Sequence, residues 1–190
     1  MAAFSLVELM FTLGIAATFA LSAVLATRTH LDEARAAAAA RLVVARLQQA
    51  RTRAVLRGRD TAVRVTSGTG GYLITTYEDT NGTGVLTAEI NSGVDVAIGP
   101  SERLPERFPG VDFGARASLP GAEGGVAPGT DPIRTGTADG VTFTGDGTAT
   151  PGSLYVLGRG GSQFVVRIYG ETGRTRVLRY YPAASVWAPP

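Results

Sequence analysis

The hydrophobic pattern divides the chain at Gly58 into a helical part and a β-rich part. Residues 4–27 are apolar except for a few small polar side chains and Glu8, and residues 28–57 contain neither proline nor glycine. After Gly58, apolar residues occur in short alternating runs separated by turn-forming residues, which is typical of strands. The pattern therefore predicts an α+β protein in which one long N-terminal helix packs on an antiparallel sheet at residues 59–190.

The second half of the predicted helix carries one continuous apolar stripe. Its members recur at spacings of three and four residues and are Ala36, Ala40, Val43, Leu47, Ala50 and Ala54. Their small side chains allow a sheet to approach closely. The arginines of this segment fall mostly off the stripe, so we expect them to be solvated; they are Arg41, Arg46, Arg51, Arg53 and Arg57. Residues 28–58 are therefore predicted to be an amphipathic helix that docks the head and stops at Gly58.

Seven alternating runs in the head predict strands. They are Thr61–Thr66, Tyr72–Tyr77, Val94–Ile98, Val141–Thr144, Ser153–Leu157, Phe164–Tyr169 and Thr175–Tyr180. Residues 67–71 and 171–174 are predicted to connect hairpins, because both segments are short and contain glycine. The stretch at about 100–140 is rich in proline and glycine, so we expect a loop region with little regular structure there.

Composition narrows the chemistry that the chain can perform. There is no cysteine and one histidine, His30, which excludes thiolate chemistry and a histidine-rich metal site. No nucleophile has a recognisable base, so we expect neither enzyme activity nor a cofactor. Charge is uneven: residues 28–59 hold eight arginines and two acids, residues 60–158 five arginines and twelve acids, and residues 159–190 five arginines and one acid. A basic tail of this kind can attract a polyanion.

Glu8 is the only charge in residues 4–27. As a helix this segment would span about 36 Å, enough to cross a bilayer core of about 30 Å. A carboxylate inside such a helix costs about 2.5–3.5 kcal/mol on insertion scales. Nothing basic lies within two helical turns of Glu8 in this chain. We therefore expect its partner to come from another molecule; a cut before Phe4 would give a neighbouring subunit a free amine for this purpose.

The segment Phe4-Ser5-Leu6-Val7-Glu8-Leu9 resembles the start of mature type IV pilins and type II secretion pseudopilins. The resemblance implies that a prepilin peptidase cuts between Ala3 and Phe4 and methylates the new amine, which leaves residues 1–3 as a short leader remnant. It implies that Glu8 is the assembly residue. The family usually has glycine before the cut and a basic leader, whereas this chain has Ala3 and an uncharged start.

The same resemblance implies a pilin fold and a place in a filament. Residues 4–27 would anchor the subunit in the bacterial inner membrane with its head in the periplasm, and would later pack into the filament core. The implied partners are other pilin or pseudopilin subunits, the prepilin peptidase and the inner membrane.

The head is similar to the heads of H-type (GspH) minor pseudopilins and of FimT- and FimU-type minor pilins. The matching landmarks are Phe143-x-x-Asp146-Gly147, the strand Ser153–Leu157 and a final hairpin that closes at Gly173-Arg174. The leading interpretation is a structural minor pilin that assembles into a type IV pilus. The alternatives are an H-type minor pseudopilin of a type II secretion system and a pilus-associated DNA receptor for natural transformation.

Two segments of the head are candidate binding sites. Asp79-x-Asn81-x-Thr83-Gly84 is similar to the start of a calcium loop, although the sequence favours an ordinary turn that is satisfied by Asx side chains. In the last strand, alternation places Arg174 and Arg176 on one face, where they could grip the phosphates of double-stranded DNA.

Arg179 and two tyrosines follow the second candidate segment, and tyrosines can stack on bases. This arginine-rich end resembles the DNA-binding tail of FimT-type pilins. A turn that leads into a solvated strand is the structural alternative.

Overall fold

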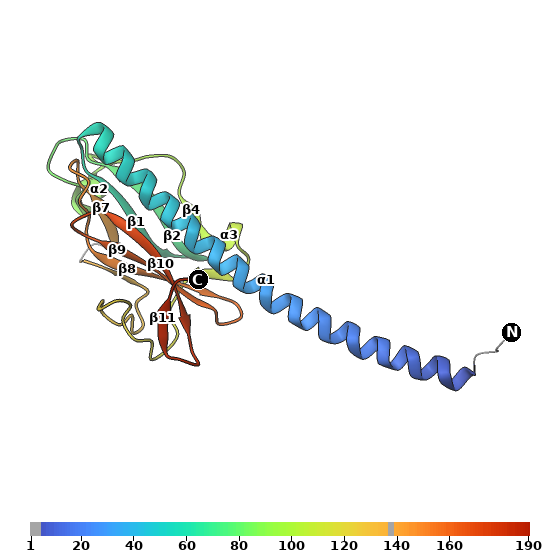
Figure 1. Cartoon of the computed structure of the whole chain (residues 1–190). Coiled ribbons are helices and arrows are strands. Elements are labelled where there is room, and N and C mark those ends of the chain that lie inside the picture. Colours follow the sequence, from blue (N-terminus) through green and yellow to red (C-terminus); the bar gives the residue numbers. More distant parts are fainter. Residues whose placement is uncertain (1–4, 137–138) are drawn as a thin grey trace.

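The computed structural model describes residues 5–136 and 139–190, without the side chains of residues 21–29. One long helix lies with its C-terminal half across two antiparallel sheets, and its N-terminal half runs away from the head (Figure 1). The predicted α+β class is therefore confirmed, with two sheets in place of one.

Helix α1 (Leu6–Arg57) is uninterrupted for 52 residues. It contains no proline, which would remove a backbone hydrogen bond and kink it. It ends at Gly58, which has a φ of 61° and donates its amide to the carbonyl of Ala54. Glycine adopts this left-handed conformation without the steric penalty of a Cβ, so the predicted stop is confirmed.

All six residues of the predicted stripe are buried, with at most 2% of their surface exposed. They contact strands of both sheets and join one core cluster with large side chains of the head, among them Phe143, Leu154, Phe164 and Ile168. The stripe is therefore the surface on which the head is built, as predicted.

The two sheets share no strand. The first has the order β3-β2-β1-β7, with β4 also pairing β2, and the second has the order β11-β10-β9-β8-β5, with β6 also pairing β8. The strands are β1 (Thr61–Gly68), β2 (Gly71–Glu78), β3 (Val96–Ala97), β4 (Glu102–Arg103), β5 (Val111–Phe113), β6 (Ile133–Thr135), β7 (Gly140–Phe143), β8 (Gly152–Gly158), β9 (Gln163–Tyr169), β10 (Arg174–Tyr181) and β11 (Val186–Ala188). Both predicted hairpin connections and all seven predicted strands are present, although the strand predicted at Val94–Ile98 is shorter and covers only Val96–Ala97.

The segment at about 100–140 is more regular than predicted. It contains the strands β4, β5 and β6 and the short helix α3 (Leu104–Arg107). Another short helix, α2 (Thr87–Ser92), and the strand β11 were also not predicted. These elements are two to six residues long, so they are too short to show a hydrophobic period of their own. The longer strands β2, β8 and β10, against which β4, β5, β6 and β11 pair, determine where these strands form.

The far side of the second sheet carries a smaller core. Tyr155, Val165 and Leu178 are buried there together with Ala122 from the loop between β5 and β6. Trp187 of β11 packs edge-on against Tyr155, with ring centroids 5.8 Å apart, and its indole N–H donates to the carbonyl of Pro120 at 2.9 Å. The loop is therefore fastened over the sheet.

Three of the stripe's flanking arginines were wrongly predicted to be simply solvated. Arg46 pairs with Glu102, Arg53 pairs with Glu78, and the Nε of Arg51 donates to the carbonyl of Gly147 at 3.2 Å. Their partners lie in β4, at the end of β2 and in the loop after β7, and the helical pattern alone could not place them beside these arginines. Arg41 and Arg57 are exposed, as predicted, although Arg57 also reaches Glu78 at 3.7 Å.

Truncation of the stripe should loosen the head. We expect Leu47→Ala, at a fully buried position, to lower the free energy of unfolding by about 2–5 kcal/mol, because it leaves a cavity between helix and sheets. Leu56→Ala removes the same atoms from a side chain that is 80% exposed, and should change the free energy of unfolding by less than about 0.5 kcal/mol. Denaturant titration followed by the fluorescence of the single tryptophan, Trp187, measures both. Equal effects of the two substitutions would contradict the docking face.

Candidate functional site

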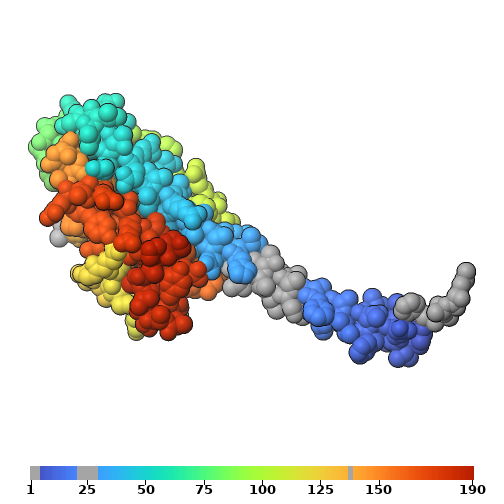
Figure 2. Space-filling view, in the orientation of Figure 1, coloured from blue at the N-terminus to red at the C-terminus, as the bar shows by residue number. Residues whose placement is uncertain are grey.

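The N-terminal part of α1 has no contact with the head. Residues 5–20 are exposed throughout, and Figures 1 and 2 show this part of the helix standing clear of the sheets. Eight large apolar side chains are between 42% and 74% exposed; they are Leu6, Val7, Leu9, Met10, Phe11, Leu13, Ile15 and Phe19. Monomeric soluble proteins rarely expose a continuous apolar surface of this kind, which marks a protein or membrane interaction site.

Glu8 lies in the first turn of α1, on this apolar surface. It forms no hydrogen bond or ion pair with any residue that the structure describes. An acid in a first turn interacts favourably with the helix dipole, but by less than about 1 kcal/mol at an exposed site. The helix dipole is therefore too weak to serve as the counter-charge that Glu8 needs in an apolar environment.

The predicted processing site, Ala3 and Phe4, lies outside the described residues. Within the described part of the chain, no helix is both long and apolar enough to cross a membrane. The predicted span, residues 4–27, includes Phe4 and the side chains of residues 21–27, which the structure does not describe.

The carboxylate of Asp79 organises the predicted calcium loop from within. The side chain is 3% exposed, and it accepts the backbone amides of Asn81 at 3.0 Å, Gly82 at 2.7 Å and Gly84 at 3.0 Å. Burial opposes ionisation of this carboxyl, but the amide hydrogen bonds outweigh it and lower its pKa. This arrangement is that of an Asx-type turn.

The other two predicted ligands bond to Glu89 of α2. The amide of Asn81 donates to it at 2.8 Å, and the hydroxyl of Thr83 donates to the same carboxylate at 2.7 Å. Among the residues that the structure describes, no three acidic or histidine side chains are grouped so as to hold a metal ion. The oxygens of the loop are thus engaged with each other, and calcium binding there stays a prediction.

The structure brings together two of the three predicted DNA-binding arginines. Arg174 and Arg176 are exposed on the face of β10 that points away from α1. Arg179 lies on the opposite face, where it pairs with Glu33 of α1 and stacks 4.9 Å from the ring centre of Tyr181. Strand alternation explains the difference, because positions 174 and 176 share a parity that position 179 does not.

A groove of about 680 Å³ runs beside the two exposed arginines and is also lined by Arg167 and Tyr169. Glu123, from the loop between β5 and β6, pairs with Arg176 at 2.7 Å and accepts a hydrogen bond from the hydroxyl of Tyr169. That bond raises the pKa of Tyr169. Sequence reasoning missed Glu123, since it is 53 residues from Arg176 and nothing in its own segment marks it.

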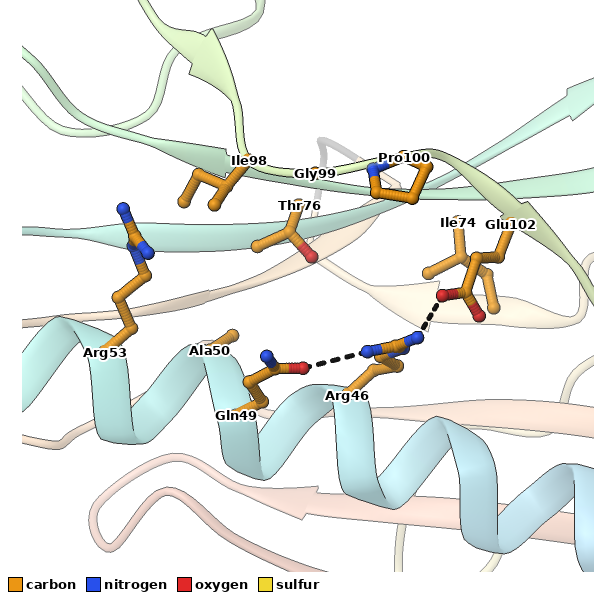
Figure 3. A pocket seen from close by; sticks show the side chains of 10 residues that line it. All are labelled: Arg46, Gln49, Ala50, Arg53, Ile74, Thr76, Ile98, Gly99, Pro100 and Glu102. Carbon is orange, nitrogen blue, oxygen red and sulfur yellow. Dashed lines mark hydrogen bonds and ion pairs between the residues drawn. The ribbon is translucent and has the colours of Figure 1, made fainter.

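A second cleft, of about 230 Å³, lies between α1 and β2 (Figure 3). In it, Arg46 donates to Gln49 at 2.9 Å and to Glu102, while Ile74 and Pro100 supply apolar walls. The dashed lines in Figure 3 join Arg46 to Gln49 and to Glu102. The contacts of Arg46 therefore fasten the helix to the first sheet.

The family described as "Type II transport protein GspH" matches residues 39–173, which is well over half of the chain. Two solved structures of the minor pseudopilin EpsH from the type II secretion system of Vibrio cholerae are also similar. Both are 18% identical and match 76% of this chain, covering 97% and 94% of theirs, with TM-scores of 0.48 and 0.49. No curated protein sequence matches the chain.

The family match covers the docking half of α1 and the head as far as Gly173. It therefore carries the assignment of the head, whereas Glu8 and Arg174 lie outside the matched range.

Removal of the Asp79 carboxylate should destabilise the head. Asp79→Ala leaves the backbone amides of Asn81, Gly82 and Gly84 without their acceptor, so we expect the free energy of unfolding to fall by about 1–3 kcal/mol. Because the pKa of Asp79 is lowered by folding, its stabilising effect is present above the ordinary value of about 3.9 and is lost as the pH falls below it.

The wild type should accordingly lose stability more steeply below pH about 4 than Asp79→Ala does. Denaturant titrations at a series of pH values measure this difference. Glu171→Ala, at an exposed acid, is the control and should behave like the wild type. Parallel curves for wild type and Asp79→Ala would contradict the role of the carboxylate.

Proposed function

The chain belongs to the GspH family of type II transport proteins, and we propose that it is a non-enzymatic minor pseudopilin that joins a type II secretion filament. The observation that carries the proposal is a single helix with two different surfaces. One half is buried against the head, and the other half exposes a continuous apolar surface with one unpaired acid.

Burial of that surface is the driving force for assembly. Transfer of apolar area out of water contributes about 25 cal/mol per Å², so eight large exposed side chains favour a bilayer or a bundle of helices over water. In the membrane, residues 4–27 anchor the subunit with its head in the periplasm. In the filament, the same residues pack against the helices of neighbouring subunits.

Glu8 selects the register of this packing. A bundle of apolar helices has many registers of similar energy, but a register that leaves Glu8 without a counter-charge is costly. A cationic group on the neighbouring subunit neutralises it. The amine of Phe4 is such a group once a prepilin peptidase has cut after Ala3 and methylated it.

A minor pilin of a type IV pilus would use the same helix and the same acid. The description of the matched family favours the secretion filament over the pilus. Copurification distinguishes the two, because the chain would be recovered with pseudopilins in the first case and with pilins in the second.

DNA binding is a second candidate function, favoured by one observation. Arg174 and Arg176 are exposed together above a groove that Arg167 and Tyr169 also line. Guanidinium groups pair with phosphates, and an aromatic ring offers a stacking surface. Arg179 would contribute through the stability of the hairpin, because it faces α1.

Loss of the Glu8 charge should prevent incorporation. In cells that lack the native chain, we expect Glu8→Gln to reduce the amount of subunit recovered with purified filaments by at least about tenfold, because an unpaired buried charge remains on the neighbour. Thr12→Ala, one turn further along the same exposed surface, should be recovered like the wild type; the hydroxyl of Thr12 bonds only within its own helix. Normal recovery of Glu8→Gln would contradict the assembly mechanism.

The second candidate has its own test. The full-length chain in detergent should shift double-stranded DNA in a salt-sensitive way, and Arg174→Ala/Arg176→Ala should weaken binding about tenfold while lowering the salt slope by about 2. Arg41→Ala/Arg59→Ala removes two other exposed arginines and should leave binding unchanged. Binding that ignores salt, or an equal loss in the control, would exclude a DNA site on this face.

A further inference from the structure

Three exposed arginines gather at the end of the head where α1 leaves it. Arg107 ends α3, Arg116 follows β5, and Arg159 lies in the turn between β8 and β9. They come from three separate segments, and we call the surface that they form the neck surface.

Two close contacts link these three segments. Gly110, three residues after Arg107, packs against the side chain of Arg159, because a Cβ on this glycine would lie 2.9 Å from the Nε of Arg159. The backbone amide of Arg116 donates to the side chain of Gln163 at 3.0 Å, and Gln163 begins the strand that follows the turn. The fold therefore fixes the neighbourhood of all three arginines.

The turn between β8 and β9 also determines which part of α1 lies beside the neck surface. A Cβ on Gly158 would lie 2.9 Å from the Cβ of Ala36, and a Cβ on Gly160 would lie 3.9 Å from the Cβ of Asp32. The turn thus lies beside residues 32–36 of the helix, where the buried stripe begins. Figure 1 shows the helix continuing from this level away from the head.

The three arginines of the neck surface have no charged partner. None of their side chains forms an ion pair or hydrogen bond with the residues that the structure describes. Nearby acids are engaged elsewhere: Asp32 with Arg35 at 3.1 Å, Glu106 with Arg103 at 3.3 Å, and Glu33 with Arg179. Asp112, which lines a cleft with Arg159, accepts the backbone amides of Tyr72 and Phe113.

The expected position of the bilayer brings its headgroups to the same level. This step rests on the membrane anchoring proposed above. Residues 4–27 are about 36 Å long and fill a hydrocarbon core of about 30 Å when the helix tilts by about 30–35°. Asp32 follows five residues later, which places it about 6 Å beyond the core in the tilted helix. The headgroup layer on each side of the core is about 5–8 Å thick. The turn beside Asp32 therefore meets the phosphate groups.

We propose that the neck surface docks the head onto the anionic phospholipids of the membrane in which the subunit is anchored. Guanidinium groups bind phosphate with two parallel hydrogen bonds, and basic residues near an anionic leaflet are attracted within a Debye length of the surface. Docking holds the head against the bilayer before the subunit enters a filament, and extraction into the filament breaks the contact.

Energy transfer from a label on the neck to labelled lipid headgroups tests the proposal. The chain has no cysteine, so Gly160→Cys gives a single attachment site beside Arg159. The full-length protein is placed in nanodiscs of phosphatidylcholine alone or with about 30% phosphatidylglycerol. We expect higher transfer with phosphatidylglycerol, and loss of the increase when salt rises from about 0.05 M to about 0.5 M.

A triple variant and a matched control distinguish the effect of the neck arginines from the effect of the total positive charge. Arg107→Ala/Arg116→Ala/Arg159→Ala should lower the ratio of docked to free heads by at least about tenfold in anionic nanodiscs. Arg41→Ala/Arg57→Ala/Arg59→Ala removes the same charge from exposed sites on and after α1 and should retain docking. Equal transfer in both lipid compositions, or equal loss in both variants, would overturn the proposal.

Two other ligands give different results. If millimolar inorganic phosphate releases the head, the surface is a general phosphate site and the lipid proposal is wrong. If transfer is independent of anionic lipid but rises with the number of copies per disc, the partner is a second copy, and the proposal is also wrong. A chain that fails to float with vesicles of either composition refutes the anchoring itself, whereas a chain that floats without docking refutes only the neck surface.

Discussion

The buried stripe of α1 is the interaction on which the rest of the molecule depends. Six small or medium apolar residues, spaced for one face of a helix, let strands of both sheets approach the same helix. The stripe begins at Ala36, and the helix lies clear of the head at residues 5–20. Where the stripe begins therefore determines which part of the helix is docked and which part must find its cover in lipid or in another subunit.

The charges of the chain follow from this division. Arginines beside the stripe reach acids of the head, as Arg46 and Arg53 do, and so fasten the helix to the first sheet. Where the stripe starts, the acids are already paired and three arginines remain exposed. In the apolar N-terminal segment, residues 4–27, Glu8 is the one charged residue. What each charged side chain does therefore depends on whether it lies beside the buried stripe, where the stripe begins, or on the exposed N-terminal part of α1.

Local patterns predicted those features whose causes lie within a few residues. The stripe, the stop at Gly58 and the seven predicted strands follow from periodicity and turn residues. The strands β4, β5, β6 and β11 escaped prediction because pairing with longer strands creates them. The same holds for the site: parity predicted that Arg174 and Arg176 share a face, but the contacts of Arg179 with Glu33 and of Arg176 with Glu123 span 146 and 53 residues.

A reconstruction of the assembled filament at side-chain resolution would show what covers the exposed part of α1. The account predicts that residues 5–20 of this subunit are enclosed by the helices of its neighbours, and that a cationic group of an adjacent subunit lies within ion-pair distance of the Glu8 carboxylate. A filament in which this subunit is held by its head alone, with Glu8 facing water, would contradict it.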